Sequence, residues 1–297
     1  MKLITPQNWV EYELIDAGNF EKLERFGKYV VSRPEPQAIW DKALPENEWH
    51  NMANAEFKKE KSGGLAGEKG EWLIKPGMAE QWHIGYQYKE MAIKMRLGLT
   101  SFKHVGIFPE QADNWNYIYD SIQGLKINEQ PKVLNLFAYT GGASLVAKAA
   151  GADIVHVDSI KQVINWSAEN MAASNLSDIR WVIEDAVKFV NREVKRGKQY
   201  HGIIMDPPSY GHGPNGEKWI LEDKLNDLLK QCKQLLAPKN NFFILNLYST
   251  GVSSIMAETL VESIFGQQKD KDIGALYLND KSGRKLPTGV LYRFRNL

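Results

Sequence analysis

The stretch from residue 133 to residue 158 places the strongest constraint on how this chain folds. An apolar run over 133–137 predicts a buried parallel strand, and a glycine turn follows it. Residues 143–150 are small and apolar, which predicts a helix packed closely on a sheet and ended by Gly151. A second apolar run then ends on Asp158. A strand, a glycine turn, a helix and an acid-tipped strand in this order are typical of a nucleotide-binding unit.

Each part of this unit has a chemical reason. Glycine lets the backbone approach a ligand, and the start of the helix offers free N–H groups to an anionic group of that ligand. Asp158 can accept hydrogen bonds from both hydroxyls of a ribose, although it can also cap the helix that follows. Two cofactors share this layout, a dinucleotide and S-adenosylmethionine. The dinucleotide fingerprint G-x-G-x-x-G is absent, because the turn carries adjacent glycines alone.

A second informative element follows the fourth apolar run, where residues 206–210 read D-P-P-S-Y. Pro207 and Pro208 fix the backbone and leave carbonyl groups free of neighbouring N–H donors. Asp206 can then accept a hydrogen bond from an amine at the reacting centre, and Tyr210 can stack on a flat substrate. The alternatives are a plain strand-ending proline turn and an ordinary half-buried tyrosine.

With these motifs in order, residues 133–208 resemble the class I S-adenosylmethionine-dependent methyltransferases. The turn is most similar to that of the bacterial large-subunit ribosomal RNA methyltransferases, which also reads L-F-x-Y-T-G. The resemblance implies an α/β fold with a Rossmann-like, mainly parallel seven-stranded sheet, helices on both faces and one antiparallel strand in the last hairpin. It also implies S-adenosylmethionine as the cofactor and S-adenosylhomocysteine as the product.

The resemblance places cofactor contacts in the turn, at the acid that ends the second strand, after the third strand, and in an upstream segment. After the third strand Glu184 and Asp185 compete for the adenine amino group, and either can instead cap the next helix. The upstream segment reads G-x-F-x-D-x-R in the family, and Ala112 stands here in place of its arginine. The predicted cofactor residues are Phe108, Glu110, Phe137, Ala138, Tyr139, Thr140, Gly141, Gly142, Asp158, Ser159, Glu184, Asp185 and Asp206. The predicted catalytic residues are Asp206, Pro207, Pro208 and Tyr210.

Cysteine usage separates the possible reaction types. The chain has one cysteine, Cys232, on the apolar stripe of a predicted helix, where it is typical of a core. Related 5-methylcytosine enzymes carry an attacking cysteine after the fifth strand, where residues 246–251 of this chain hold none. A thiolate mechanism is therefore excluded, and ring nitrogens, exocyclic amines, hydroxyls and protein nitrogens remain as acceptors. The similar enzymes that methylate guanine at ring nitrogen seven also lack that cysteine.

The charge balance limits how the chain can bind a polyanion. Lysine and arginine total 37 against 36 for aspartate and glutamate, a net charge of +1. RNA would therefore bind at a local patch rather than through bulk charge. Lys188 and Arg192 lie on a basic helix face that could serve, although a solvated face is the simpler interpretation. The sequence has no cysteine cluster, and no apolar run approaches the roughly 20 residues needed to span a membrane. We therefore expect a cytoplasmic protein without metal or membrane association.

The first 78 residues predict a small β-rich module that can dock the substrate, because short apolar runs alternate there with turn signals. Within it, polar residues 58–64 predict a loop or hairpin tip. Residues 79–297 form the predicted methyltransferase domain. The leading hypothesis is methylation of a ribosomal RNA base at a nitrogen, without a covalent cysteine intermediate. A protein or small-molecule substrate, and a non-catalytic RNA- or partner-binding module on the same fold, remain open.

Overall fold

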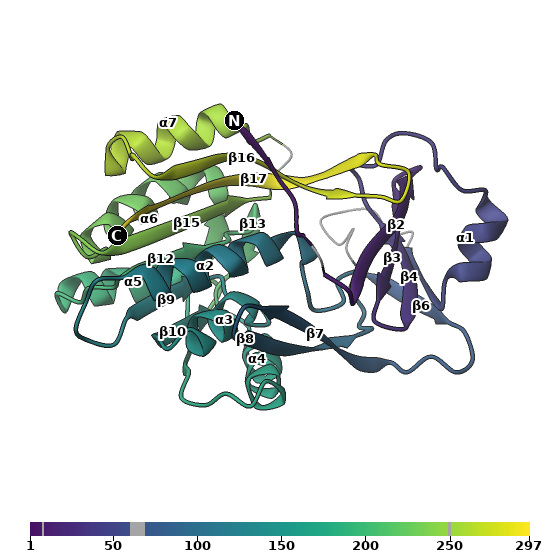
Figure 1. Cartoon of the computed structure of the whole chain (residues 1–297), viewed down its shortest axis with the longest axis horizontal. Helices are drawn as coiled ribbons and strands as arrows, with labels where there is room; N and C mark the ends of the chain where they lie inside the picture. The colour runs from purple at the N-terminus through teal and green to yellow at the C-terminus, as the bar shows by residue number, and fades with distance from the viewer. Residues whose placement is uncertain (8, 60–68, 249–250) are drawn as a thin grey trace.

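The computed structural model describes residues 1–7, 9–59, 69–248 and 251–297. Its centre is an eight-stranded sheet with the order β1-β16-β17-β15-β12-β9-β10-β11. Neighbouring strands are parallel except around β17, which runs antiparallel to both β15 and β16. Without β1 this is the predicted seven-stranded sheet with its antiparallel strand in the last hairpin. The predicted fold is confirmed, and β1 adds an eighth strand at the edge (Figure 1).

Most strands of this sheet are buried because helices cover both of its faces. β12 and β15 are buried along their whole length, as expected for parallel-sheet strands with near-continuous apolar sequences. The strands are β1 (Lys2–Ile4), β9 (Lys132–Leu136), β10 (Asp153–Asp158), β11 (Arg180–Ile183), β12 (Gly202–Met205), β15 (Asn241–Leu247), β16 (Lys271–Asn279) and β17 (Lys285–Asn296).

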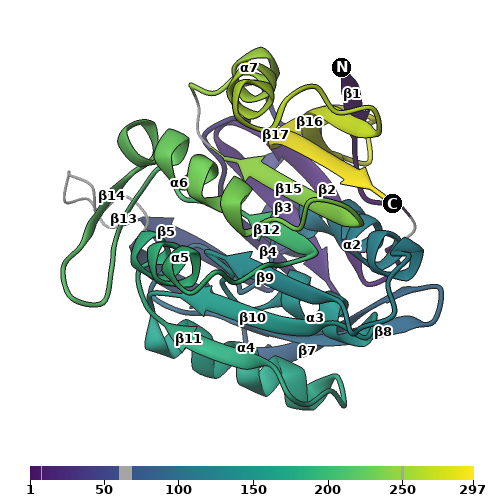
Figure 2. The ribbon, with the colours of Figure 1, turned by 90° about the vertical axis from the view of Figure 1, so that its left-hand side faces the viewer.

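The helices divide between the two faces. One face packs against α2 (Ala112–Gly124), α3 (Gly142–Ala149) and α4 (Lys161–Ala173), and the other against α5 (Ala186–Lys195), α6 (Leu221–Leu235) and α7 (Ser254–Phe265). Figure 2 looks onto the face that α5 and α6 cover. The predicted apolar stripe of α6 is buried against this face, at Leu221, Leu225, Leu228, Leu229, Cys232 and Leu235.

The N-terminal part of the chain forms a second sheet and a hairpin, which confirms the predicted β-rich module. The sheet has the order β2-β3-β4-β5-β6, and the hairpin β7–β8 packs against α3 and α4. The boundary at residue 78 stays a prediction, and residues 60–64 lie outside the described part of the chain. The elements are β2 (Tyr12–Gly18), β3 (Glu21–Phe26), β4 (Tyr29–Pro34), α1 (Glu46–Met52), β5 (Ala55–Lys59), β6 (Gly70–Ile74), β7 (Gln81–Tyr88) and β8 (Met91–Gly98).

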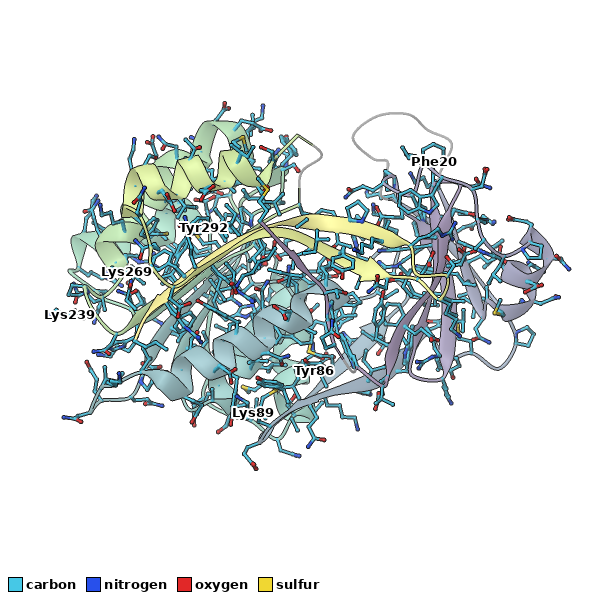
Figure 3. The ribbon with its side chains drawn as sticks, turned by 45° about the horizontal axis from the view of Figure 1, so that its top comes forward. Phe20, Tyr86, Lys89, Lys239, Lys269 and Tyr292 are labelled. Atoms are coloured by element: carbon cyan, nitrogen blue, oxygen red, sulfur yellow. The ribbon has the colours of Figure 1, made fainter. Side chains whose placement is uncertain are left out.

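The hairpin of β16 and β17 connects the two sheets. It crosses from the central sheet to the N-terminal one, as the yellow strands of Figure 1 show. Arg284 in its turn pairs with Asp16 of β2 and donates a hydrogen bond of 2.7 Å to the Asp41 carbonyl. At its other end, Tyr292 is buried between β17 and α7, whereas Phe20 stands exposed on the N-terminal sheet (Figure 3). The hairpin therefore fixes the N-terminal sheet to the methyltransferase-like part.

Candidate active site

The parallel strands end together at one edge of the central sheet. β9 pairs with β10 and β12 in a register that sets Phe137, Asp158 and Asp206 level with one another. Asp158 also pairs with Ile183 of β11, so Glu184 stands one residue further along. With strands about 4.8 Å apart, the row from Glu184 to Asp206 spans about 14 Å. The structure thus brings the glycine turn and the D-P-P corner, residues 206–208, to the same edge.

The glycine turn has an unusual backbone. Phe137, Tyr139 and Gly141 have φ angles of 56°, 49° and 92°, although positive φ is uncommon outside glycine. Backbone strain of this kind costs on the order of 1–3 kcal/mol per residue and persists only where the surroundings enforce it. Gly142 begins α3, and a Cβ there would lie 2.7 Å from the Trp115 ring. The turn therefore needs glycine for its approach to α2, and it starts a helix whose first N–H groups lack helical partners.

Side chains of neighbouring segments fix the carbonyl groups of the turn. Ser167 Oγ donates 2.7 Å to the Tyr139 carbonyl, and Asn170 Nδ2 donates 2.9 Å to the Thr140 carbonyl, both from α4. The Thr140 hydroxyl in turn donates 2.7 Å to the carbonyl of Gly106. These contacts supply the constraint that the strained backbone requires, and they join the turn to the upstream segment.

Asp158 supports the turn as well as facing it. Its two carboxylate oxygens accept hydrogen bonds from the backbone N–H groups of Tyr139, at 2.9 Å, and Ile160, at 3.0 Å. The N-cap position of α4 is Ile160, with no side-chain cap, so Asp158 does not cap that helix. Burial raises the pKa of Asp158, although its backbone hydrogen bonds act in the opposite direction. Each oxygen keeps a second lone pair, so the carboxylate can still accept from ribose hydroxyls.

The two acids after β11 have other partners. Glu184 forms two hydrogen bonds of 2.5 Å with the guanidinium of Arg192. Asp185 caps α5 by accepting from the N–H of Lys188 at 2.9 Å. The capping alternative therefore holds for Asp185, and the adenine contact of either acid stays a prediction.

The D-P-P corner presents an acid with a different environment. Asp206 is half-buried, and within the described residues its carboxylate accepts no hydrogen bond. Burial raises the pKa of Asp206 to about 7. The Pro208 carbonyl accepts from Trp219 Nε1 at 2.6 Å, and the Trp219 ring packs 4.8 Å from that of Phe137. Trp219 therefore joins the corner to the turn.

A short hairpin of β13 (Tyr210–His212) and β14 (Lys218–Ile220) follows the corner. Tyr210 is 40% exposed, and its stacking role stays a prediction beside the alternative of an ordinary half-buried tyrosine. Its hydroxyl lies 3.0 Å from His212 Nε2. Ser159, which follows Asp158, donates 3.2 Å to the His212 carbonyl. The hairpin thus extends from the corner back to the end of β10.

The upstream segment also reaches this edge. The Phe108 ring lies 5.3 Å from that of Tyr139 and 6.2 Å from that of Tyr248, the residue after β15. Glu110 lies in the short 3₁₀ helix η1 (Pro109–Gln111) and is 4% exposed. Burial raises the pKa of Glu110 to about 7. Ala112, where the family pattern has arginine, is fully buried at the start of α2.

The sequence-based predictions missed a polar network beneath the corner. Asn246, at the end of β15, donates 3.0 Å to Gln111 and accepts 2.9 Å from Asn114, which also accepts from Arg293. These four residues come from three distant segments, and isolated amides in a sequence carry no signal of their pairing. The buried ion pairs of the N-terminal sheet, Lys22 with Glu35 and Arg33 with Glu24, were missed for the same reason.

A family model of S-adenosylmethionine-dependent methyltransferases matches residues 67–265, which include the turn, Asp158 and the D-P-P corner. The chain belongs to this family. The enzyme is therefore a methyltransferase that uses S-adenosylmethionine, as the sequence predicts. The crystal structure of such a methyltransferase from Agrobacterium tumefaciens has a TM-score of 0.89 and 36% identity, and the alignment covers 100% of this chain and 94% of that one.

Several curated relatives of this chain are named as ribosomal RNA methyltransferases. Ribosomal RNA large subunit methyltransferase K/L of Shewanella frigidimarina is 28% identical over 162 residues, 53% of this chain and 22% of that protein. The chain thus spans about a fifth of the length of the first such relatives. A protein described as a methyltransferase complexed with SAH shares the fold, with a TM-score of 0.69, 18% identity and coverage of 95% of this chain and 75% of that one.

Two further properties concern the residues that the structure describes. No helix there has the length and apolar character required to cross a membrane. Nor does that part of the methyltransferase contain three or more His, Cys, Asp or Glu side chains grouped to hold a metal ion.

Proposed function

We propose that this methyltransferase transfers the methyl group to a nitrogen of a ribosomal RNA base, without a covalent cysteine intermediate. Asp206 carries the proposal, because its carboxyl group stands level with the cofactor turn and accepts no hydrogen bond from the described residues. Such a carboxylate can accept a hydrogen bond from an amine and then its proton. Because burial raises the pKa of Asp206 to about 7, the group is matched to proton transfer near neutral pH.

In the proposed reaction, different residues at this edge of the sheet bind the cofactor, position the acceptor and accept its proton. Bound S-adenosylmethionine supplies a methyl group on a positively charged sulfur. The turn over 137–142 and Asp158 would hold its amino-acid and ribose parts. Pro207 and Pro208 fix the corner so that the acceptor nitrogen is held in line, at the roughly 3–3.5 Å that such displacements require. Asp206 would hold the acceptor N–H and take its proton as the nitrogen gains the methyl group.

The cysteine of the chain supports a mechanism without a thiolate. Cys232 is fully buried on α6, with its Sγ 3.7 Å from Met205 Sδ in the core. Burial raises the pKa of Cys232, so the thiol stays protonated. A cytosine C5 acceptor needs attack by a thiolate, which leaves nitrogen as the acceptor that best suits Asp206.

The exposed hairpin after the corner supports an RNA substrate. Tyr210 is exposed there, and the ammonium of Lys218 lies 5.9 Å from the centre of its ring. An aromatic ring beside a cation suits an unpaired base and its phosphate. The relatives that are named as ribosomal RNA methyltransferases support the same substrate class. Such a substrate would place the enzyme in the cytoplasm, as the sequence predicts.

The test compares ribosomal RNA from cells with and without this protein as a substrate for the purified enzyme and labelled S-adenosylmethionine. RNA from the cells without it should accept label, and RNA from the other cells should not, because its site is already methylated. Nucleoside digestion and mass spectrometry should find the label on a base nitrogen. Asp206→Asn should abolish labelling, and Asp227→Asn, on the exposed side of α6, should not. Label that resists nuclease but yields to protease would contradict the proposal.

A further inference from the structure

Two polar side chains stand inside the buried strands on either side of the glycine turn. Asn135 of β9 and His156 of β10 lie directly opposite each other in the sheet, and they are 2% and 0% exposed. Their neighbours along each strand are leucine or valine, as expected for buried parallel strands. A buried polar group is costly unless it is hydrogen-bonded, so this pair needs partners in the core.

Ser144 of α3 supplies the partner for both side chains. Asn135 Nδ2 donates a hydrogen bond of 2.9 Å to Ser144 Oγ, which lies 3.0 Å from His156 Nδ1. Ser144 is 0% exposed and is the third residue of the helix that the glycine turn begins. In the part of the chain that the structure describes, its hydroxyl has no third partner. The three side chains therefore connect β9, the first turn of α3 and β10.

The direction of these hydrogen bonds fixes where the proton of His156 lies. An amide N–H can only donate, so Ser144 Oγ accepts from Asn135, and its own proton goes to His156 Nδ1. Nδ1 is then an acceptor, and the proton of the neutral ring stands on Nε2. Burial lowers the pKa of His156 to about 3, against a smaller opposing effect of the Tyr139 carbonyl, so the ring is neutral near pH 7.

The imidazole ring of His156 also packs beneath the glycine turn. A Cβ at Gly141 would lie 3.6 Å from His156 Cε1 and 3.2 Å from Ser167 Cβ. Gly141 has a φ of 92°, and Ser167 Oγ donates to the Tyr139 carbonyl from α4. His156 Nε2 is buried and has no hydrogen-bond partner of regular geometry among the described residues. The turn is thus held from the α4 side by Ser167 and from the sheet side by His156.

We propose that His156 is a positioning residue for the cofactor, because its neutral ring, fixed by Ser144 and Asn135, sets the place of Gly141 and of the first turn of α3. The N–H groups at this helix start would face the anionic end of the cofactor. Leucine and valine would fill the two strand positions at lower cost, so the buried polar chain calls for a functional reason. This inference rests on the proposed function for the placement of the cofactor at the turn, and the methyl acceptor plays no part in it.

The first experiment needs no change to the residues of the chain. The full-length enzyme is labelled with ¹⁵N in its histidine rings, and long-range ¹H–¹⁵N spectra distinguish the two neutral tautomers and the charged ring. His156 should hold the Nε2–H tautomer from about pH 5 to 8, where exposed histidines change charge. The signals that His156→Phe loses identify the residue. A proton on Nδ1, or a charged ring in this pH range, would overturn the inference.

A double-mutant cycle then tests the link to the cofactor. His156→Phe and Ser144→Ala should each weaken the binding of S-adenosylhomocysteine by about 5- to 10-fold in calorimetric titration. The double variant should bind about as weakly as the single variants, because the two side chains act as one unit. The single-turnover rate at saturating S-adenosylmethionine should stay within about 2-fold of the wild type. Unchanged affinity in both single variants, or losses that multiply in the double variant, would contradict the inference.

Two control variants separate this role from packing in general. Ser121 of α2 is as buried as Ser144 and has a hydroxyl without a partner among the described residues, and His83 is exposed on β7. Ser121→Ala and His83→Phe should bind S-adenosylhomocysteine within about 2-fold of the wild type. Thermal unfolding shows that each variant is folded. An equal loss of affinity in Ser121→Ala would assign the effect to packing and reject the inference.

The outcomes distinguish this inference from the proposed function. Methylation of RNA at a nitrogen, together with unchanged cofactor affinity in His156→Phe, would retain the function and reject the positioning role. Weakened and coupled binding without RNA methylation would do the reverse. If S-adenosylhomocysteine leaves the amide signals of Gly141 and Gly142 unchanged, the cofactor does not lie at the turn, and the inference fails together with that placement.

Discussion

Two acids at the same edge of the central sheet have opposite surroundings. Asp158 accepts hydrogen bonds from two backbone N–H groups, at 2.9 Å and 3.0 Å, and so becomes part of the turn that it faces. Asp206 stands level with Phe137 on the next strand and accepts no hydrogen bond within the described residues. An acid with fixed partners can orient a ligand, whereas an acid without them can exchange a proton. Under the proposed function, Asp158 belongs to a cofactor side of the edge and Asp206 to an acceptor side.

The two sides also differ in their origin. The cofactor side comes from one continuous unit, β9–α3–β10, with support from α4. The acceptor side combines the D-P-P corner, η1 and buried charges of the N-terminal sheet. We therefore expect substitutions on the first side to change cofactor affinity, and those on the second to change the chemical step.

The largest effect is expected at the acceptor side. Asp206→Asn keeps the shape of the corner but cannot accept a proton. Methyl transfer in a single turnover should fall by about 10³-fold, within the usual range for loss of a general base. Affinity for S-adenosylmethionine, measured by titration, should stay within about 3-fold. An equal loss of affinity and rate would erase the distinction between the two sides.

Asp158→Ala should weaken cofactor binding more than it slows methyl transfer. It removes the proposed ribose contact and the acceptor for the Tyr139 N–H, and a hydrogen bond to a charged group is worth about 1.5–3 kcal/mol. Affinity for S-adenosylmethionine should therefore fall by about 10- to 100-fold, while the single-turnover rate at saturating cofactor changes less. Asp227→Ala, on the exposed side of α6, is the control, and calorimetric titration of both variants is the measurement. Unchanged affinity in Asp158→Ala would remove that residue from the site.

Glu110→Gln should change how stability depends on pH. The pKa of Glu110 is raised to about 7, above the value of about 4.3 expected in the unfolded chain. Between these values the folded state binds more protons, so wild-type stability falls as pH rises from about 4 to 7. By pH 8 the loss approaches about 3.7 kcal/mol at most, and Glu110→Gln removes it. Melting temperatures at pH 5 and pH 8 test this, with Glu90→Gln as control. An unchanged pH dependence in Glu110→Gln would contradict it.

The smallest effect is expected at the exposed hairpin. Tyr210→Leu removes an aromatic surface on which a base can stack. Base stacking is worth roughly 1–3 kcal/mol, and the Tyr210 ring is only partly covered. The KM for RNA should therefore rise by about 5-fold. Tyr210→Phe keeps the ring and should change KM by less than about 2-fold. Steady-state kinetics of the two variants give the comparison. Equal effects of both changes would assign the role to the hydroxyl rather than the ring.

The cofactor side was predictable because its signals are local. The apolar run before Phe137, the adjacent glycines and the acid at 158 follow one another within 26 residues, and each dictates backbone geometry directly. β1 could not be predicted in the same way, because it has three residues and pairs with β16 some 270 residues later. The sequence shows where a strand forms but not which distant strand covers its edge.

The acceptor side shows a second limit. Lys22 and Arg33 carry charges that in a sequence indicate a solvated face, yet both are buried beside glutamates. Their partners come from other strands and, for Arg33, from the distant Lys103 carbonyl at 3.5 Å, which no local pattern encodes. The D-P-P motif indicated where Asp206 lies, but its lack of hydrogen-bond partners is a property of the folded structure.

A structure of the enzyme with S-adenosylhomocysteine tests the division of the edge most directly. We expect both ribose hydroxyls within about 3 Å of the Asp158 carboxylate, and Asp206 facing the sulfur with its carboxylate still free. A ribose bound at Glu184, or a sulfur on the far side of the sheet from Asp206, would contradict the account.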